Sequence, residues 1–179
     1  GASQPLVTHY VVYLAVGSGS SVVSKSKLGS DVVAGTNTLS IFADTPIGVH
    51  THLAVYIKSS LTEQTTPAGA VPINDLDGTV RSLTFGDRDF DIAQIGGAVT
   101  WQPPLQVAQI THYAAFLAKD ILGTAAALIG NEVPVGTNLV TLPVSTPLDS
   151  YTHVVVYAKT VLGFQTRPAA VPIADTPFV

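Results

Sequence analysis

The chain has 179 residues, of which 46% are hydrophobic and only 11% are charged, and its net charge is −4. This composition argues against disorder and provides no basic surface for nucleic acid, and the apolar runs are too short for membrane insertion. The absence of cysteine excludes disulfides and thiolate chemistry, while twelve prolines and fifteen glycines argue against long helices.

The first part of the chain predicts short strands between turn residues, at 10–15, 21–26, 38–42, 51–58 and 68–73. Two further strands are predicted in the middle, at 83–85 and in the stretch that ends at Trp101-Gln102-Pro103-Pro104. The apolar alternation there buries Val99 and Trp101 on one face, and the double proline ends the strand. Short strands between such turn residues are typical of an all-β sandwich.

The last part predicts strands at 112–118, 124–129, 138–142, 152–159 and 169–173. The alanine-rich stretch 124–129 is also compatible with a helix on propensity alone. Its counterpart in the first part, residues 20–25, favours a strand, so we predict a strand in both places.

The two outer parts are copies of one another. Thr8-His9-Tyr10 returns as Thr111-His112-Tyr113, and Gly35-Thr36-Asn37 returns as Gly136-Thr137-Asn138. Residues 51–58 return as 152–159, and Val71-Pro72-Ile73 returns as Val171-Pro172-Ile173. A period of about 100 residues suits whole tandem domains rather than the short units of solenoids.

The second copy resembles a fibronectin type III domain, a sandwich of two packed sheets. The residues that carry the resemblance, in chain order, are Leu83-Thr84-Phe85, then Val99, Trp101 and Pro104, then Ile110, Tyr113 and Ala115, and finally Val156, Ala158 and Gly163. Two positions depart from the family pattern. The corner tyrosine falls at Tyr151 instead of Thr152, and the first copy has Thr62 where the second has Gly163.

The resemblance implies an all-β chain of two tandem immunoglobulin-like (fibronectin type III-like) sandwiches. We expect an incomplete first repeat at residues 1–78, which lacks its first two strands, and a complete second repeat at 79–179. The unrepeated strands between 80 and 104 belong to the second repeat in the family's order, but in a permuted unit they would complete the first. The residues expected in the cores are Trp101, Tyr113, Val156, Ala158, Tyr10 and Val55. In either arrangement one copy exposes a sheet face and an open edge, which predicts self-association.

Two groups of residues are weak metal candidates. His50 and His52, two positions apart on a predicted strand, are spaced to bind zinc or copper, although a half-exposed strand entry explains them better. Asp87, Asp89 and Asp91 resemble a sparse calcium loop but lack the glycine and glutamate of an EF-hand. We therefore expect no metal or other cofactor.

No catalytic constellation stands out. The serines of Gly17-Ser18-Gly19-Ser20-Ser21 lack the strand–helix context of a nucleophile elbow and favour a hairpin loop. The sequence thus predicts a non-catalytic structural, spacing or adhesive repeat module from a large multi-repeat protein at the cell surface or outside the cell. Its partners would be neighbouring repeats or other proteins. A carbohydrate- or calcium-binding accessory module is the alternative.

Overall fold

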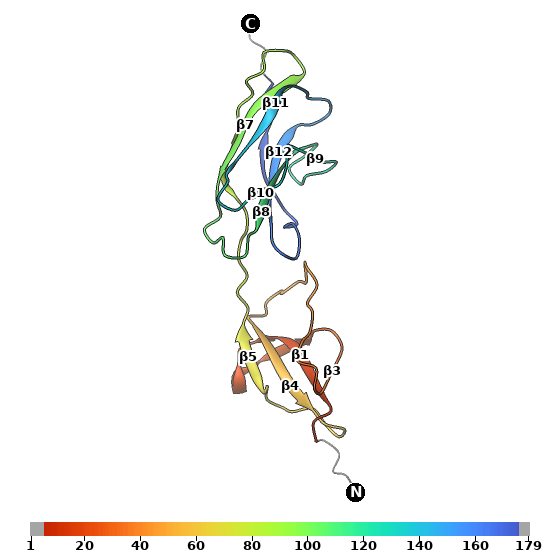
Figure 1. Cartoon of the computed structure of the whole chain (residues 1–179). Coiled ribbons are helices and arrows are strands. Elements are labelled where there is room, and N and C mark those ends of the chain that lie inside the picture. The colour runs from red at the N-terminus through yellow and green to blue at the C-terminus, as the bar shows by residue number, and fades with distance from the viewer. Residues whose placement is uncertain (1–5, 176–179) are drawn as a thin grey trace. The chain divides into compact units, whose positions relative to one another are not determined.

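The computed structural model describes residues 6–175, and the chain divides into two compact units, Gly1–Asp75 and Leu76–Val179 (Figure 1). Within the described residues the structure is all-β, and the one helical segment is the 3-10 turn η1 (Gly19–Ser21). The predicted fold class is therefore confirmed. No helix in this part of the chain is long and apolar enough to cross a membrane.

Unit 2 is a sandwich of two antiparallel sheets. The first has the order β11-β7-β6, formed by β6 (Arg81–Phe85), β7 (Gln94–Gln102) and β11 (Leu139–Pro147). The second has the order β10-β8-β12-β13, formed by β8 (His112–Ala118), β10 (Val133–Pro134), β12 (His153–Lys159) and β13 (Ala169–Pro172), with β9 (Ala127–Leu128) also on β8. This arrangement is fibronectin type III-like.

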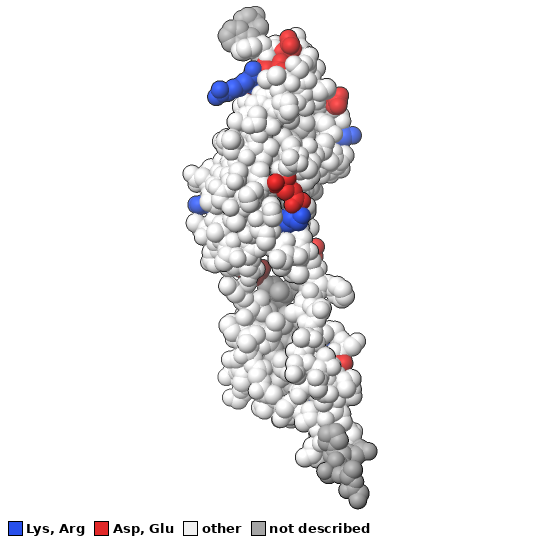
Figure 2. All heavy atoms as spheres, viewed as in Figure 1, with Lys and Arg blue, Asp and Glu red and all other residues white. Residues whose placement is uncertain are grey.

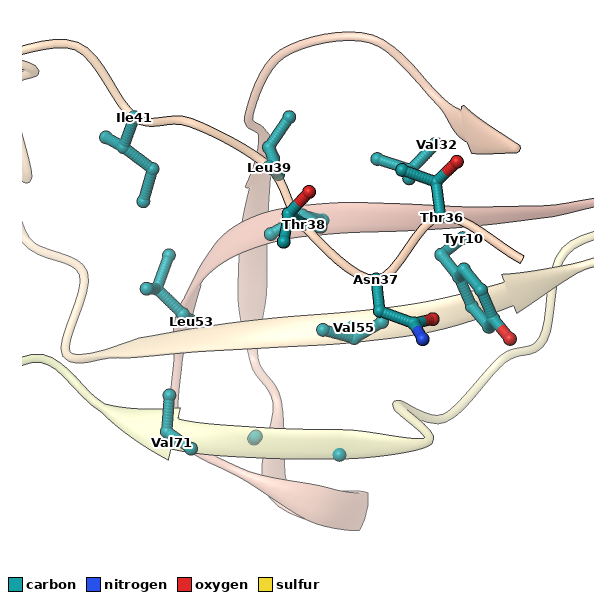
Figure 3. Close-up of a pocket in the computed structure, with 13 residues that line it drawn as sticks. Tyr10, Val32, Thr36, Asn37, Thr38, Leu39, Ile41, Leu53, Val55 and Val71 are labelled. Atoms are coloured by element: carbon teal, nitrogen blue, oxygen red, sulfur yellow. The ribbon is translucent and has the colours of Figure 1, made fainter. Parts of the chain in front are cut away.

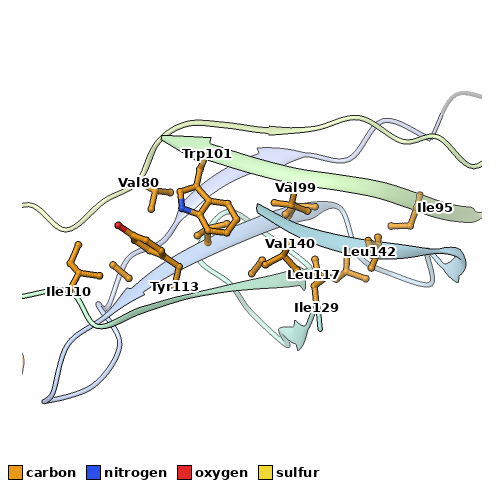
Figure 4. Close-up of a cluster of buried hydrophobic side chains, with 14 residues drawn as sticks. Val80, Ile95, Val99, Trp101, Ile110, Tyr113, Leu117, Ile129, Val140 and Leu142 are labelled. Carbon is orange, nitrogen blue, oxygen red and sulfur yellow. The ribbon is translucent and has the colours of Figure 1, made fainter. Parts of the chain in front are cut away.

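The core of unit 2 lies between these sheets (Figure 4). Along β7, apolar residues at alternate positions bury Val99 and Trp101 against the facing sheet, because successive side chains of a strand point to opposite faces. The Trp101 ring meets the Tyr113 ring edge-on, with centroids 5.6 Å apart. Val156 and Ala158 of β12 are buried in the same core.

Unit 1 is a single sheet. It has the order β2-β1-β4-β5, formed by β1 (His9–Val16), β2 (Ser24–Lys27), β4 (His52–Lys58) and β5 (Gly69–Pro72), with β3 (Val32–Val33) also on β1. Val12 pairs with Val55 as Ala115 pairs with Val156 in unit 2. Unit 1 therefore repeats the second sheet of unit 2 in the same register.

Residues 38–42, which we predicted to be a strand, have no strand conformation in the structure. Their counterpart in unit 2 lies in β11, which pairs with β7, for example Val140 with Val99. The described part of unit 1 contains no strand equivalent to β7, so the backbone of residues 38–42 has no ladder to join. The prediction was wrong here because strand formation depends on a partner that the local sequence does not specify.

The unrepeated middle strands belong to unit 2. Thr100 of β7 pairs with Thr84 of β6 on one side and with Leu139 of β11 on the other. The permuted arrangement, in which these strands complete the first copy, is therefore wrong. The predicted strand at 124–129 is also shorter than expected, because only Ala127–Leu128 pair with β8.

Candidate functional site

One face of the unit 1 sheet is apolar and uncovered. We call it the open face and define it by Tyr10, Val12, Leu53, Val55 and Val71, which alternation along β1, β4 and β5 places on the same side. The first four are half-buried, and Val71 is 58% exposed. Tyr10 and Val55, which we expected in a core, thus lie in a surface.

The matched positions in unit 2 have the opposite exposure. Tyr113, Ala115, Val154 and Val156 correspond to Tyr10, Val12, Leu53 and Val55, and all four are 0% exposed. They are buried because the sheet of β6, β7 and β11 covers them. The difference between the units is therefore the presence of a covering sheet and not the pattern of the strands.

The open face forms the floor of a groove of about 560 Å³. Figure 3 shows Leu53 and Val71 pointing from the sheet toward the side on which the segment with Leu39 and Ile41 crosses it. The lining contains no carboxylate, imidazole or amine, and its polar groups are the Tyr10 phenol and the side chains of Thr36, Asn37 and Thr38. Such a groove can bind an apolar surface, but it offers no acid–base pair for proton transfer.

The segment that forms the wall of this groove, residues 36–42, begins with the same local conformation as its counterpart in unit 2. Gly35 and Gly136 share a φ of 97°, a left-handed conformation that favours glycine. The turn that follows has the same hydrogen bond in both units, 3.0 Å long, from Thr36 N to Val33 O and from Thr137 N to Pro134 O. We call residues 36–42 the wall segment.

The far end of the wall segment also matches. Asp44 and Ser145 have positive φ values of 60° and 57°. The Thr45 hydroxyl donates to Phe42 O at 2.7 Å, as the Thr146 hydroxyl donates to Pro143 O at 2.7 Å. The backbone at both ends of the wall segment therefore has the conformation found at the ends of β11. The wall segment differs from β11 in having no strand to pair with.

The wall segment also exposes apolar side chains. Ile41 is 40% exposed and Phe42 is 86% exposed, whereas Leu142, the counterpart of Ile41, is 4% exposed. Full burial of one Val, Leu, Ile or Phe side chain stabilises by roughly 1.5–3 kcal/mol. A binding partner that covers the open face and the wall segment would thus gain binding free energy from the burial of several apolar side chains.

The opposite face of the unit 1 sheet is closed by a small cluster. Val11, Ala15, Ala54 and Tyr56 are buried there, with Tyr13 packed against them. The Tyr13 hydroxyl donates to Glu63 at 2.9 Å, and Lys25 pairs with Glu63 at 2.8 Å. Burial, together with the hydrogen bond to Glu63, raises the pKa of Tyr13 to about 12.

Lys25 completes this cluster. Its ammonium lies 3.6 Å from the centroid of the Tyr56 ring and 4.1 Å from that of Tyr13, close enough for cation–π attraction. In unit 2 the matched place is filled by the rings of Phe116, Tyr157 and Phe164, packed edge to face. Among the described residues, aromatic rings and long side chains thus pack on this face in both units, whereas the open face of unit 1 has no such cluster.

The three aspartates of the weak calcium candidate lie in the loop between β6 and β7. Asp87 accepts hydrogen bonds from the backbone N–H groups of Asp89 and Gly96, at 3.0 and 2.9 Å. Asp89 accepts from the N–H groups of Asp91 and Ser145, which lower the pKa of its carboxyl group. In the structure the carboxylates of Asp87 and Asp89 therefore cap backbone groups and fix the loop to β7 and β11.

The histidine candidates make local hydrogen bonds. His50 precedes β4, and its Nδ1 lies 2.8 Å from Ile47 O, while Nδ1 of His52 lies 2.8 Å from the Thr51 hydroxyl. The pair Thr152–His153 repeats the second contact at 2.7 Å. Across residues 6–175, no group of three or more His, Asp or Glu side chains is arranged to hold a metal ion.

An ion pair recurs at matched positions of the two units. Lys58 lies 2.7 Å from Asp31, and Lys159 lies 2.8 Å from Glu132. Asp31 also pairs with Lys27 at 2.5 Å, and these two lysines lower its pKa to about 2. Few other charges appear on the surface drawn in Figure 2, where most of the area is uncharged.

The sequence interpretation missed Val12, Leu53, Val71 and the wall segment as functional residues. It did predict that one copy would have an uncovered sheet face, because the strand of Trp101 has no counterpart in the other copy. The face could have been located from the sequence by combining two observations. Apolar residues alternate along the strands of the first copy as they do in the second, and the first copy has no counterpart of the strand that contains Trp101.

Comparisons with known proteins give a fold-level likeness. A scan of protein-family models found no match, and a search of curated proteins found no significant match. Among solved structures, the chain is similar to the crystal structure of chicken CNTN1 FN1-FN3 domains, with 13% identity and a TM-score of 0.39. The match covers 93% of this chain and 56% of that chain.

Proposed function

We propose that this chain is a non-catalytic repeat module with a structural or adhesive role, which acts through protein–protein contacts made by the open face of unit 1. One observation supports this most directly. The groove over the open face is apolar, its lining has no carboxylate, imidazole or amine, and the matched surface of unit 2 is buried against a sheet. Surfaces of this kind on soluble proteins are typical of interaction sites.

The likeness of the two units supports a role as a repeat in a larger assembly. The two units share their strand registers and a lysine–carboxylate ion pair. Units that share one fold in this way can follow one another along a chain as repeats. We propose neighbouring repeats or other proteins as its partners. In accordance with the resemblance to fibronectin type III domains, we propose a place outside the cell or at its surface.

Sedimentation velocity over a range of concentrations tests this proposal. We expect the chain to self-associate reversibly in the absence of another partner, because the open face then has only other copies to bind. Ile41→Lys should abolish the association, since it places a charge beside the groove. Leu61→Lys is the matched control, because Leu61 is 94% exposed and does not line the groove. Equal association of all three proteins would contradict the proposal, and the absence of association in all three would contradict the part of it that expects copies of the chain to bind one another.

The alternative functions have their own measurements. A shift of the melting temperature between calcium and chelator would support a calcium site at Asp87, Asp89 and Asp91. Heat on titration with micromolar zinc would support a site at His50 and His52, and binding on a glycan array would support the carbohydrate alternative. No contact in the described residues favours these over the open face.

A further inference from the structure

We infer that the occupant of the open face is an antiparallel β-hairpin of the β6–β7 type, supplied by residues other than the 179 of this sequence. Its inner strand would pair with the wall segment and insert alternate apolar side chains, including an indole, into the groove. This inference rests on the proposed function and specifies its partner by chemistry. Three features of the molecule support it: the shape of the face, the unpaired backbone beside it, and the burial of the chain's own hairpin in unit 2.

The first feature is the match between the two sheet faces. In unit 2 the core is completed by Ile95, Val99 and Trp101 of β7, which are nearly or fully buried. The open face has an aromatic ring and aliphatic side chains at the positions that these residues cover, with Tyr10 in the place of Tyr113. A partner strand with the same alternation would therefore meet Tyr10 with its indole, as Trp101 meets Tyr113 in unit 2.

The second feature is the backbone of the wall segment. In unit 2, Val140 and Leu142 pair with Val99 and Gly97 of β7, and Trp101 N donates to Asn138 O at 3.2 Å. In unit 1 the counterparts Leu39 and Ile41 have no strand opposite them. Both ends of the wall segment already have the conformation found around β11. It thus presents backbone groups to an incoming strand, which is the physical basis of recognition by strand addition.

The third feature is the burial of the chain's own hairpin in unit 2, which bears on where the occupant comes from and how many strands it has. The chain's own β7 is held between β6 and β11, and Trp101 is buried, so a second copy can supply its hairpin only by opening its own unit 2. A single added strand would lack the partner that β6 provides along the outer edge of β7 in unit 2. These two facts favour a separate hairpin over a domain-swapped copy or a lone strand.

A synthetic peptide of residues 79–104, which contains β6 and β7, is the probe. Titrated into the isotope-labelled full chain, it should shift the NMR signals of Val12, Leu53 and Val55. It should also slow amide hydrogen exchange at residues 38–42. The peptide with Trp101→Ala should bind about tenfold more weakly or worse, because buried tryptophans dominate such interfaces. The peptide should also dissociate any self-associated chain.

Two protein variants serve as matched controls. Ile41→Lys should lose peptide binding, and Leu61→Lys should bind as the unsubstituted chain does. Because a free hairpin can be poorly soluble, a second arm joins residues 79–104 to the start of the full chain through a flexible Gly/Ser linker. In that protein, residues 38–42 should gain exchange protection, and unit 1 should melt at a higher temperature.

Unchanged amide exchange at residues 38–42 in both experiments would overturn the inference. Changes confined to residues 139–142 would overturn it too, because they would mean that the added hairpin replaces β6 and β7 in unit 2. If the chain self-associates through Ile41 but neither arm protects residues 38–42, the open face binds another copy face to face. The proposed function then stands and the hairpin assignment fails. If the peptide binds but the chain alone stays monomeric, the hairpin assignment stands and the self-association expected above does not.

Discussion

The two units place the same strands in the same register, yet residues at matched positions have opposite exposure. Val156 in unit 2 is fully buried, whereas Val55 in unit 1 lies half-exposed on the floor of a groove. Both valines alternate with residues that point to the other face of their sheets. The comparison teaches that alternation selects a face, while a second sheet decides whether that face becomes a core.

The units also differ in how they close the other face. Unit 2 uses three aromatic rings, and unit 1 uses Tyr13, Tyr56 and the ion pair of Lys25 with Glu63. A lone sheet has one fewer apolar layer to stabilise it, so the contacts on its closed face carry a larger share of its stability.

The largest expected effect is that of Trp101→Ala. Removing a buried aromatic side chain from a core costs about 3–5 kcal/mol, and this loss should be confined to unit 2. Tyr10→Ala, at the position in unit 1 that matches Tyr113, should cost only about 1 kcal/mol because the ring is half-exposed. Hydrogen exchange at amides of β12 and β4, measured in increasing denaturant, reports the two units separately. A loss in unit 1 from Tyr10→Ala as large as the loss in unit 2 from Trp101→Ala would refute the difference in burial.

A matched pair in the wall segment and in β11 comes next. Leu142→Ala should destabilise unit 2 by about 2–5 kcal/mol, because it leaves a cavity in a packed core. Ile41→Ala should change the stability of unit 1 by no more than about 0.5 kcal/mol, as is usual for surface positions. Chemical denaturation of the two variants, followed by the same amides, measures both values. A large loss for Ile41→Ala would show that unit 1 already depends on the wall segment.

A smaller effect is expected at high pH. The folded-state pKa of Tyr13, about 12, lies above its ordinary value of 10.0, so its contribution is fully present below pH 10 and is lost between about pH 10 and 12. Tyr13→Phe should remove this part of the alkaline dependence and cost roughly 1 kcal/mol at neutral pH, through the lost hydrogen bond to Glu63. Melting curves of unit 1 between pH 8 and 12 test this. The same alkaline slope in both proteins would mean that another group is responsible.

The smallest effect is expected at low pH. The pKa of Asp31, lowered from 3.8 to about 2, means that its contribution is present above pH 4 and is lost as the pH falls toward 2. Asp31→Asn should therefore flatten the acid dependence of unit 1 in this range. Lys27→Gln and Lys58→Gln should each remove part of the same dependence. Acid titrations of the four proteins, followed by hydrogen exchange, provide the comparison.

Much of the fold could be predicted from the sequence, because repeated turn residues and apolar alternation are local signals. The strand at Val99 and Trp101 and the matching strands of the two copies are examples. The prediction of a strand at 38–42 was wrong, because the matching residues of unit 2 form a strand by pairing with β7, and the first copy lacks an equivalent of β7. For the same reason Tyr10 and Val55 have the pattern of core residues and lie in a surface. The position of the candidate site follows from a missing partner, which no local pattern records.

Phe42 gives the wall segment one further property. Proteases bind their substrates as extended, unpaired backbone, and chymotrypsin cleaves after aromatic residues. Phe42 is 86% exposed in a segment without strand pairing, next to a turn in which its carbonyl accepts a hydrogen bond from the Thr45 hydroxyl, whereas its counterpart Pro143 lies within β11. We expect limited digestion to cut unit 1 first after Phe42 and to leave the matched place in unit 2 intact. An occupant that pairs with the wall segment would shield this bond, so the lifetime of the module under proteolysis would depend on whether its open face is filled.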